Sequence, residues 1–154
     1  MDERYATVLL LAYGNPGRRD DGLGPALARA VEALGIPGIT VDSDYQLQPE
    51  AAADVAAHKV VVFADADTSG DGPFRFEEVR PRTELSFSSH SISPAGVLGL
   101  AHELFGATTR GFLLGIRGED FEGFGEGLGS EASRNLGEAV RFIEPVLRER
   151  RFPG

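Results

Sequence analysis

Two adjacent carboxylates, Asp20 and Asp21, are the residues of this sequence best placed to do chemistry. They follow an apolar run at 7–12 that stops at a Gly14-Asn15 turn, and a segment with helical spacing begins just after them. Paired acids at the end of a buried strand are costly to desolvate, and open α/β sheets bind ligands at such strand ends. The segment therefore predicts a site that holds a cation or a proton.

Further polar candidates follow other predicted elements. Asp65 comes directly after an apolar run at 59–64, and His90 lies just before a predicted helix start. In a parallel sheet the carboxyl ends of the strands meet at one edge, which would bring these groups together. Carboxylates and an imidazole suit a divalent transition metal such as nickel, zinc or manganese. Three protein ligands would leave coordination positions open for water or a substrate group.

Each candidate also has an ordinary structural explanation. Asp20 or Asp21 could simply cap the following helix, and capping is favoured more for Asp20 than for Asp21. Asp65 could form a turn, and His90, among serines, could be a hydrogen-bonded loop histidine. The two remaining histidines lie in helical contexts and are expected to serve surface or packing roles: His58 and His102.

Two further segments of the sequence are predicted to be loops or turns. The Arg18-Arg19 pair is expected to be a solvated turn, and the Gly-rich, acidic stretch at 118–129 a mobile loop. Within that loop, Phe121 and Phe124 either form an exposed interaction surface or tuck inward. Dinucleotide, P-loop and nucleophile-elbow signatures are absent from the sequence.

The elements that must position these residues alternate along the chain. Apolar runs predict buried strands at 7–12, 39–41, 59–64 and 110–116, and an alternating pattern predicts a strand with one wet face at 74–79. Helical spacing predicts helices at 23–34, 49–58, 94–105 and from Ser130 to about 147, with a kink or weak point at Pro145 and a frayed tail at 148–154. Strands alternating with helices predict one α/β domain over 1–154, a three-layer αβα sandwich of phosphorylase/hydrolase type with a mostly parallel twisted sheet.

Composition narrows the class of protein further. The chain has 154 residues, no cysteine and a formal net charge of -9 at pH 7. Without cysteine there are no disulfides, zinc–thiolate sites or cysteine nucleophile, and the acidic balance argues against a nucleic-acid partner. No apolar run is long enough to cross a membrane, and the first residues lack the pattern of a signal peptide, so we expect a cytoplasmic protein.

Four motifs, in order, resemble those of one family, the nickel–iron hydrogenase maturation endopeptidases. Gly14-Asn15 followed by Asp20-Asp21-Gly22-Leu23-Gly24 resembles the family's opening signature, G-N-x4-D-D/E-x-x-G. Ala64-Asp65-Ala66 resembles its A-D-A, and Ser88-Ser89-His90 resembles its S/T-x-H segment before a helix. Leu114-Gly115-Ile116 and Leu128-Gly129-Ser130 resemble the stretch before its last helix, so the resemblance spans about 7–147.

The resemblance implies a function. Family members are aspartyl-type peptidases that remove a short C-terminal extension from the hydrogenase large-subunit precursor once nickel is inserted, with the bound nickel as the recognition element. Their metal-contacting positions fall here on Asp21, Asp65 and His90, which are also the catalytic candidates, while Asp20 would support them or cap the helix. Some members carry Glu where this chain has Asp21, which shortens that ligand by one methylene. The nickel would arrive with the precursor, so we expect a monomer that is metal-free at rest.

Three alternatives stay open from the sequence. One is a permanently metallated hydrolase that uses the same three ligands. Another is a nickel-checking chaperone that binds the precursor without cleaving it. The third is a peptidase of the same fold that acts on another protein.

Overall fold

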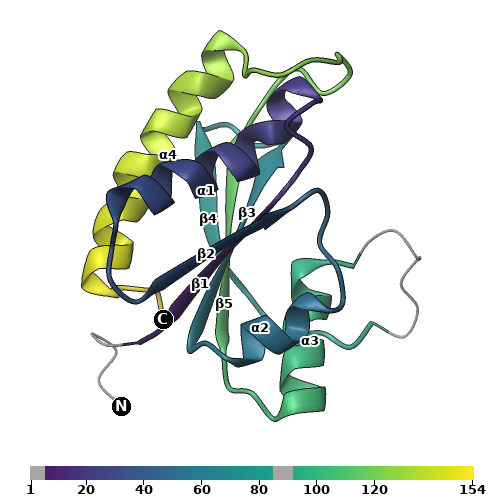
Figure 1. Cartoon of the computed structure of the whole chain (residues 1–154), viewed down its shortest axis with the longest axis vertical. Coiled ribbons are helices and arrows are strands. Elements are labelled where there is room, and N and C mark those ends of the chain that lie inside the picture. Colours follow the sequence, from purple (N-terminus) through teal and green to yellow (C-terminus); the bar gives the residue numbers. More distant parts are fainter. Residues whose placement is uncertain (1–5, 85–91) are drawn as a thin grey trace.

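The computed structural model describes residues 6–84 and 92–154, and a twisted five-stranded sheet runs through its middle (Figure 1). Its strands are β1 (Val8–Tyr13), β2 (Ile39–Asp44), β3 (Val60–Asp67), β4 (Phe74–Val79) and β5 (Arg110–Arg117). They lie in the order β2-β1-β3-β5-β4, and all pairings are parallel except that of β4 with β5. The predicted mostly parallel sheet is confirmed.

Helices cover both faces of this sheet. A short 3-10 helix, η2 (Arg19–Gly22), leads directly into α1 (Leu23–Leu34), and the later helices are α2 (Ala51–Ala56), α3 (Pro94–Phe105) and α4 (Ser130–Glu149). In Figure 1, α1 and α4 lie on one side of the sheet, and α2 and α3 on the other. A hydrophobic core lies on each face of the sheet, one against α1 and α4 and the other against α2 and α3. Successive strand residues point to opposite faces, so Leu10 packs in the former core and its neighbour Leu9 in the latter. This is the predicted three-layer sandwich.

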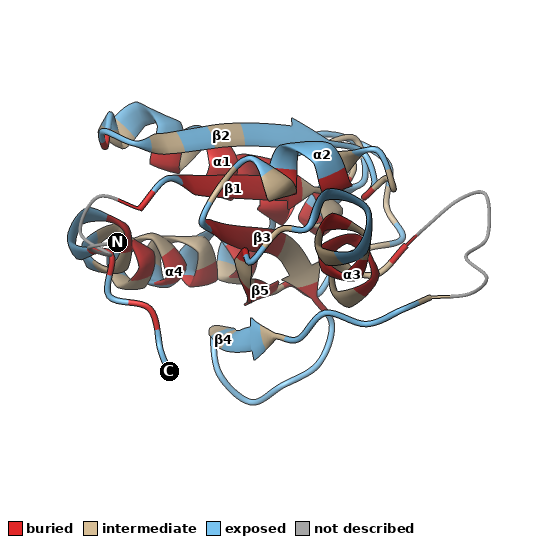
Figure 2. Ribbon diagram, turned by 90° about the horizontal axis from the view of Figure 1, so that it is seen from below, coloured by how far each residue is buried: buried red, intermediate tan, exposed pale blue. Residues whose placement is uncertain are grey.

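Burial separates the central strands from the edge strands. Figure 2 shows β1, β3 and β5 buried, with β2 and β4 largely exposed at the two edges. On β4 the exposed residues alternate with Phe74 and Phe76, whose rings pack against Phe142 of α4 with centroids 4.9 and 5.2 Å away. The prediction of one solvent-exposed face on this strand is therefore confirmed, and its other face packs against the side chains of α4.

The order of the strands places a topological switch point between the carboxyl ends of β1 and β3, the position at which open α/β sheets form a ligand-binding crevice. From β1 the chain continues through α1 to β2 at one edge of the sheet, and from β3 it continues to β4 at the other edge. The connections after β1 and β3 therefore leave two neighbouring parallel strands in opposite directions. Such a switch point is where open α/β sheets bind ligands, at the carboxyl ends of the strands.

Several predicted boundaries differ from the structure. β3 continues past Ala64 to Asp67 because its last residues stay paired with β5, so Asp65 lies in a strand rather than in a turn. Helix α2 is shorter than the predicted 49–58. Gly129, not Ser130, is the N-cap of α4, and the helix continues past Pro145 to Glu149. Among the described residues, no helix combines the length and the hydropathy needed to span a membrane.

The prediction of a frayed tail at 148–154 is wrong for most of that segment. Arg150 is only 7% exposed and Phe152 only 8%, although both follow the end of α4. The Arg150 guanidinium donates to the carbonyl oxygens of Ala6 (2.9 Å), Pro37 (2.6 Å) and Leu147. Three carbonyls that would otherwise lack a donor thus hold the chain end against the body of the protein, which the basic composition of the tail did not indicate.

We predict that Arg150→Ala lowers the free energy of unfolding by about 2–4 kcal/mol, because it leaves buried carbonyl groups without donors. Arg151→Ala is the matched control, since the Arg151 side chain is exposed and its ion pair within the described residues is with the exposed Glu149; it should change stability by about 0.5 kcal/mol or less. Urea denaturation of both variants measures this. Equal stabilities of the two variants would contradict a structural role for Arg150.

Candidate functional site

The opening signature folds as a tight turn that presses the start of α1 against the sheet. Gly14 has a φ of 142°, and a Cβ there would lie 2.1 Å from the carbonyl oxygen of Asp21. A Cβ at Gly24 would lie 2.4 Å from the carbonyl oxygen of Tyr13 and 2.7 Å from that of Ala64. Both distances are impossible for a real side chain, so glycine at these two positions is what allows η2 and α1 to reach the carboxyl ends of β1 and β3.

The turn then fixes the position of Asp21. The backbone N–H of Asn15 donates to Oδ2 of Asp21 at 2.8 Å, while the Asn15 side chain accepts from the N–H of Gly17 at 2.9 Å. Asp21 is partly exposed and makes no side-chain cap at the start of α1. One carboxylate oxygen is thus held by the turn, and the other has no hydrogen-bond partner among the described residues.

Asp65 is a partly buried carboxylate whose negative charge its surroundings stabilise only weakly. Burial raises its pKa to about 7, and the nearby charges of Asp21 and Asp67 add to the rise. Hydrogen bonding from the Ala66 N–H, at 2.8 Å, and from the Tyr13 hydroxyl opposes the rise without cancelling it. Among residues 6–84 and 92–154, no cation or cluster of backbone donors offsets the charge of Asp65, and these are the conditions under which a carboxylate favours a proton or a bound cation.

The Tyr13 hydroxyl is the side-chain hydrogen-bond partner of Asp65. The pKa of its hydroxyl is raised, first by burial and then by the negative charge of Asp65. The phenol therefore stays protonated and donates toward the Asp65 carboxylate. The sequence analysis did not single out Tyr13; its position directly before Gly14, at the last residue of β1 and beside β3, was the available signal.

Asp67 lies two residues further along β3 in a contrasting environment. Its carboxylate accepts from Nε of Arg75 at 2.6 Å and from the N–H and hydroxyl of Ser69, both at 3.2 Å. Although Asp67 is only 8% exposed, these donors hold its pKa below the usual value. Asp67 is thus a charge-paired structural residue, whereas Asp65 on the same face of the same strand is not.

Backbone N–H groups stabilise the negative charge of Asp20. It is only 2% exposed and accepts three backbone N–H bonds, from Glu119 at 2.8 Å and from Asp120 and Gly129 at 2.9 Å. These donors hold the pKa of Asp20 below its usual value despite burial. The prediction that Asp20 caps the helix that follows it is wrong, because its carboxylate binds the distant 118–129 segment instead.

Backbone hydrogen bonds tie the 118–129 segment to the turn as well. The N–H of Gly125 donates to Gly17 at 2.8 Å, and the N–H of Arg19 donates back to Gly125 at 3.1 Å. Phe121 is partly buried, while Phe124 is 82% exposed. Arg18 and Arg19 are both exposed, as predicted for a solvated turn, and these backbone bonds anchor to it a loop that the sequence predicts to be mobile.

The histidines fall into two groups. His58 hydrogen-bonds through its ring to Asp54 and Thr40, and His102 bonds to the carbonyl of Thr109, which confirms their structural roles. His90 lies outside the described residues, so its predicted place beside the carboxylates stays a prediction. Within 6–84 and 92–154, no three acidic or histidine side chains are grouped closely enough to hold a metal ion. The structure brings Asp21 close enough to Asp65 for its charge to raise the pKa of Asp65, at the carboxyl ends of β1 and β3.

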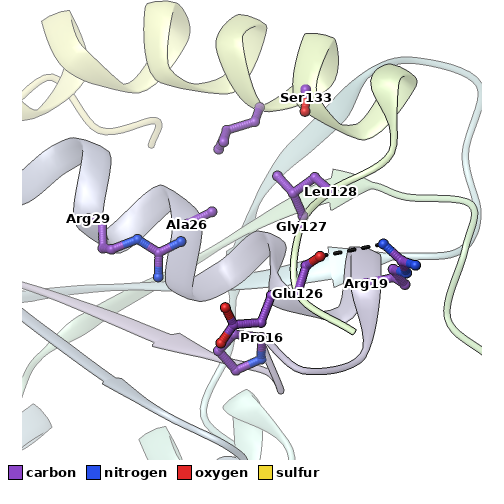
Figure 3. Close-up of a pocket in the computed structure, with 10 residues that line it drawn as sticks. Pro16, Arg19, Ala26, Arg29, Glu126, Gly127, Leu128 and Ser133 are labelled. Carbon is purple, nitrogen blue, oxygen red and sulfur yellow. Dashed lines mark hydrogen bonds between the residues drawn. The ribbon is translucent and has the colours of Figure 1, made fainter. Parts of the chain in front are cut away.

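A cavity of about 680 Å³ lies on the other side of the turn, between α1, the start of α4 and the loop residues 126–128 (Figure 3). Arg19 closes part of it by donating to the carbonyl of Glu126 at 3.4 Å. Neither Asp21 nor Asp65 lines this cavity. This cavity and the Asp65 carboxylate therefore do not coincide, and we place the candidate site at the carboxylates because the raised pKa is that of Asp65.

We predict opposite effects on stability for two neighbouring substitutions on β3. Because the pKa of Asp65 is raised in the folded protein, its ionisation costs stability as pH rises from about 4 to 7. Asp65→Asn should therefore stabilise the protein at pH 8 by about 2–4 kcal/mol, at 1.36 kcal/mol per pKa unit, with no difference left below pH 4. Because the pKa of Asp67 is lowered, its contribution is present above pH 4 and lost in acid, so Asp67→Asn should destabilise the protein at pH 8.

Denaturant unfolding of the three proteins between pH 3.5 and 8 measures both effects. Asp67→Asn is the matched control, since it makes the same chemical change on the same strand face. A loss of stability in Asp65→Asn at pH 8 would contradict the environment described for Asp65.

Comparison with known proteins adds a fold relationship. No protein-family model matches the sequence, and no curated protein matches it. Among solved structures, a nickel–iron hydrogenase maturation protease, HycI, from Thermococcus kodakarensis is similar, with a TM-score of 0.70, 22% identity and 92% of each chain covered. A hydrogenase maturating endopeptidase, HybD, from E. coli is similar at a TM-score of 0.67 and 21% identity, covering 94% of this chain and 93% of that one. A hydrogenase 2 maturation peptidase from a Thaumarchaeota archaeon is similar at 0.67 and 18%, covering 92% and 97%.

These likenesses extend over nearly the whole of both chains, at low sequence identity. The chain therefore has the fold of the hydrogenase maturation proteases.

Proposed function

We propose that this protein is an endopeptidase that removes the C-terminal extension of a nickel–iron hydrogenase large-subunit precursor after nickel has been inserted. The observation that carries the proposal is the position of Asp21 and Asp65. Asp21 lies in the motif that follows β1, and Asp65 lies in the motif near the end of β3. The two motifs meet at the switch point of a fold shared with maturation proteases. Fold alone does not specify an activity, so the proposal depends on the residues at the crevice.

The donor set at the crevice suits this substrate. In the described part of the chain, Asp65 is partly buried without a countercation, and one oxygen of Asp21 has no hydrogen-bond partner. Two hard carboxylate oxygens can complete the coordination of a nickel ion that the precursor already holds, and His90 would add an imidazole nitrogen. Nickel is here part of the substrate, so its arrival would place the adjoining peptide against the crevice.

Hydrolysis then requires a water and a base to activate it. Asp65 can act as this base through the carboxylate oxygen that does not bind nickel, since burial raises the pKa of its carboxyl group toward neutrality and favours proton uptake. Docked nickel can polarise the scissile carbonyl or lower the pKa of the attacking water. Asp20 serves a supporting role by holding the 118–129 segment beside the turn that carries Asp21.

Mass spectrometry of the cognate large-subunit precursor tests the proposal. Incubation with this protein should remove the mass of a C-terminal peptide from the nickel-loaded precursor only. Asp65→Asn and His90→Ala should each slow the cleavage by about a hundredfold or more, because each removes a group that contacts nickel or water. Asp71→Asn is the matched control, since Asp71 is exposed and belongs to none of the motifs.

The outcomes separate this proposal from its alternatives. Cleavage that continues in both Asp65→Asn and His90→Ala would contradict the assigned site. A stable complex with the nickel-loaded precursor and no loss of mass would favour a nickel-checking chaperone. Cleavage without nickel, by protein purified with a stoichiometric bound metal, would favour a permanently metallated hydrolase.

A further inference from the structure

Arg75 lies beside the candidate site on the same face of the sheet as Asp65. Asp65 on β3 and Arg75 on β4 are both in register with Gly115 on β5, one on each side of it. Residues in register point to the same face of a sheet, and adjacent strands are about 4.8 Å apart, so the two backbones are about 10 Å apart. An arginine side chain can cover most of that distance if nothing blocks its path.

Gly115 leaves that path open. A Cβ at this position would lie only 3.4 Å from both Cγ and Nε of Arg75 and 3.3 Å from Oδ2 of Asp67. The side chain of Arg75 therefore crosses the sheet over Gly115 and reaches β3, where its Nε donates to Asp67 at 2.6 Å. A larger residue at 115 would have to displace the guanidinium from this position.

Two carboxylates fix the orientation of the guanidinium. Nε donates to Asp67, and Nη1 donates to Glu77 on β4. Within the described part of the chain, Nη2 has no hydrogen-bond partner, and the side chain of Arg75 is 45% exposed. The planar guanidinium thus presents one pair of N–H donors to solvent while its other nitrogens are held.

The remaining hydrogen-bonding capacity of Arg75 indicates what it can bind. Asp67 and Glu77 occupy Nε and Nη1, so the donors left for a ligand are the two N–H groups of Nη2. A neutral peptide carbonyl can accept an Nη2 hydrogen bond without opposing these carboxylates. The bond strengthens when the carbonyl oxygen becomes negative, which is the property of an oxyanion-stabilising donor.

From this geometry we infer that Arg75 is a catalytic residue of the proposed peptidase, whose Nη2 group binds the scissile carbonyl oxygen beside Asp65. Water adds to the carbonyl carbon, and the electron pair of the C=O bond moves to the oxygen that Nη2 holds. The C–N bond then breaks as the carbonyl re-forms, and the proton released by the attacking water passes to the leaving nitrogen. The inference rests on the proposed function, since it assigns a role within that reaction.

Steady-state cleavage of the nickel-loaded precursor by Arg75→Lys is the first test. Lysine can keep the ion pair with Asp67 but cannot hold that pair and donate in the fixed direction of Nη2. We expect kcat to fall about tenfold to a hundredfold, with KM changed less than about threefold and the unfolding midpoint kept. Arg80→Ala is the matched control, because Arg80 is 88% exposed and the ion pair that it makes within the described residues, with Glu78, is 3.7 Å long; this variant should cleave normally.

Chemical rescue separates a catalytic role from a structural one. Arg75→Ala vacates the space above Gly115, and millimolar guanidinium should restore a measurable part of kcat, whereas sodium chloride at the same ionic strength should not. Unchanged kcat in both Arg75 variants, or a loss that follows the loss of folded protein and is not rescued, would overturn the role of Arg75. No cleavage by the unaltered protein would instead overturn the proposed function itself.

Discussion

The close approach of the η2–α1 turn to the ends of β1 and β3 is the constraint on which the rest of the site depends. Side chains are excluded at Gly14 and Gly24, because a Cβ at either would collide with a backbone oxygen at 2.4 Å or less. With glycine there, the turn closes tightly enough for the Asn15 N–H to hold Asp21. The same closeness keeps Asp65 partly buried and within the field of Asp21. The spacing of the opening signature is thus a packing requirement that delivers a carboxylate to the switch point of the sheet.

Within this crevice, local donors decide what each acid can do. Asp20, Asp65 and Asp67 have similar side chains near the same sheet edge, yet three backbone N–H groups hold the first and an arginine holds the last. Only Asp65 has its pKa raised, because burial there exceeds the compensation. The two compensated acids are structural: one binds the 118–129 segment, and the other positions Arg75. Hydrogen-bond donors thus stabilise the charges of Asp20 and Asp67, whereas Asp65 favours binding a proton or a cation.

The sequence was sufficient for the sheet, because the long apolar runs at β1, β3 and β5 are typical of strands covered on both faces. It was also sufficient to place Asp21 and Asp65 at one edge, since strand ends converge in a parallel sheet. It could not reveal partners that are distant along the chain. Asp20 binds residues about a hundred positions away, and Arg150 binds carbonyls at the other end of the chain, so helix capping and a frayed tail were the local interpretations. Arg75 gave no sequence signal at all, because its role depends on the register of β4 against Gly115.

The measurement that tests this account most directly is an NMR titration of the aspartate side-chain carboxyl carbons in the folded protein. The account predicts that Asp65 titrates with a midpoint near 7, while Asp20 and Asp67 titrate below 3.8. Assignment through Asp65→Asn and Asp67→Asn identifies the two signals on β3. A midpoint near 4 for Asp65, or one near 7 for Asp20 or Asp67, would contradict the claim that local donors leave Asp65 as the uncompensated acid of the crevice.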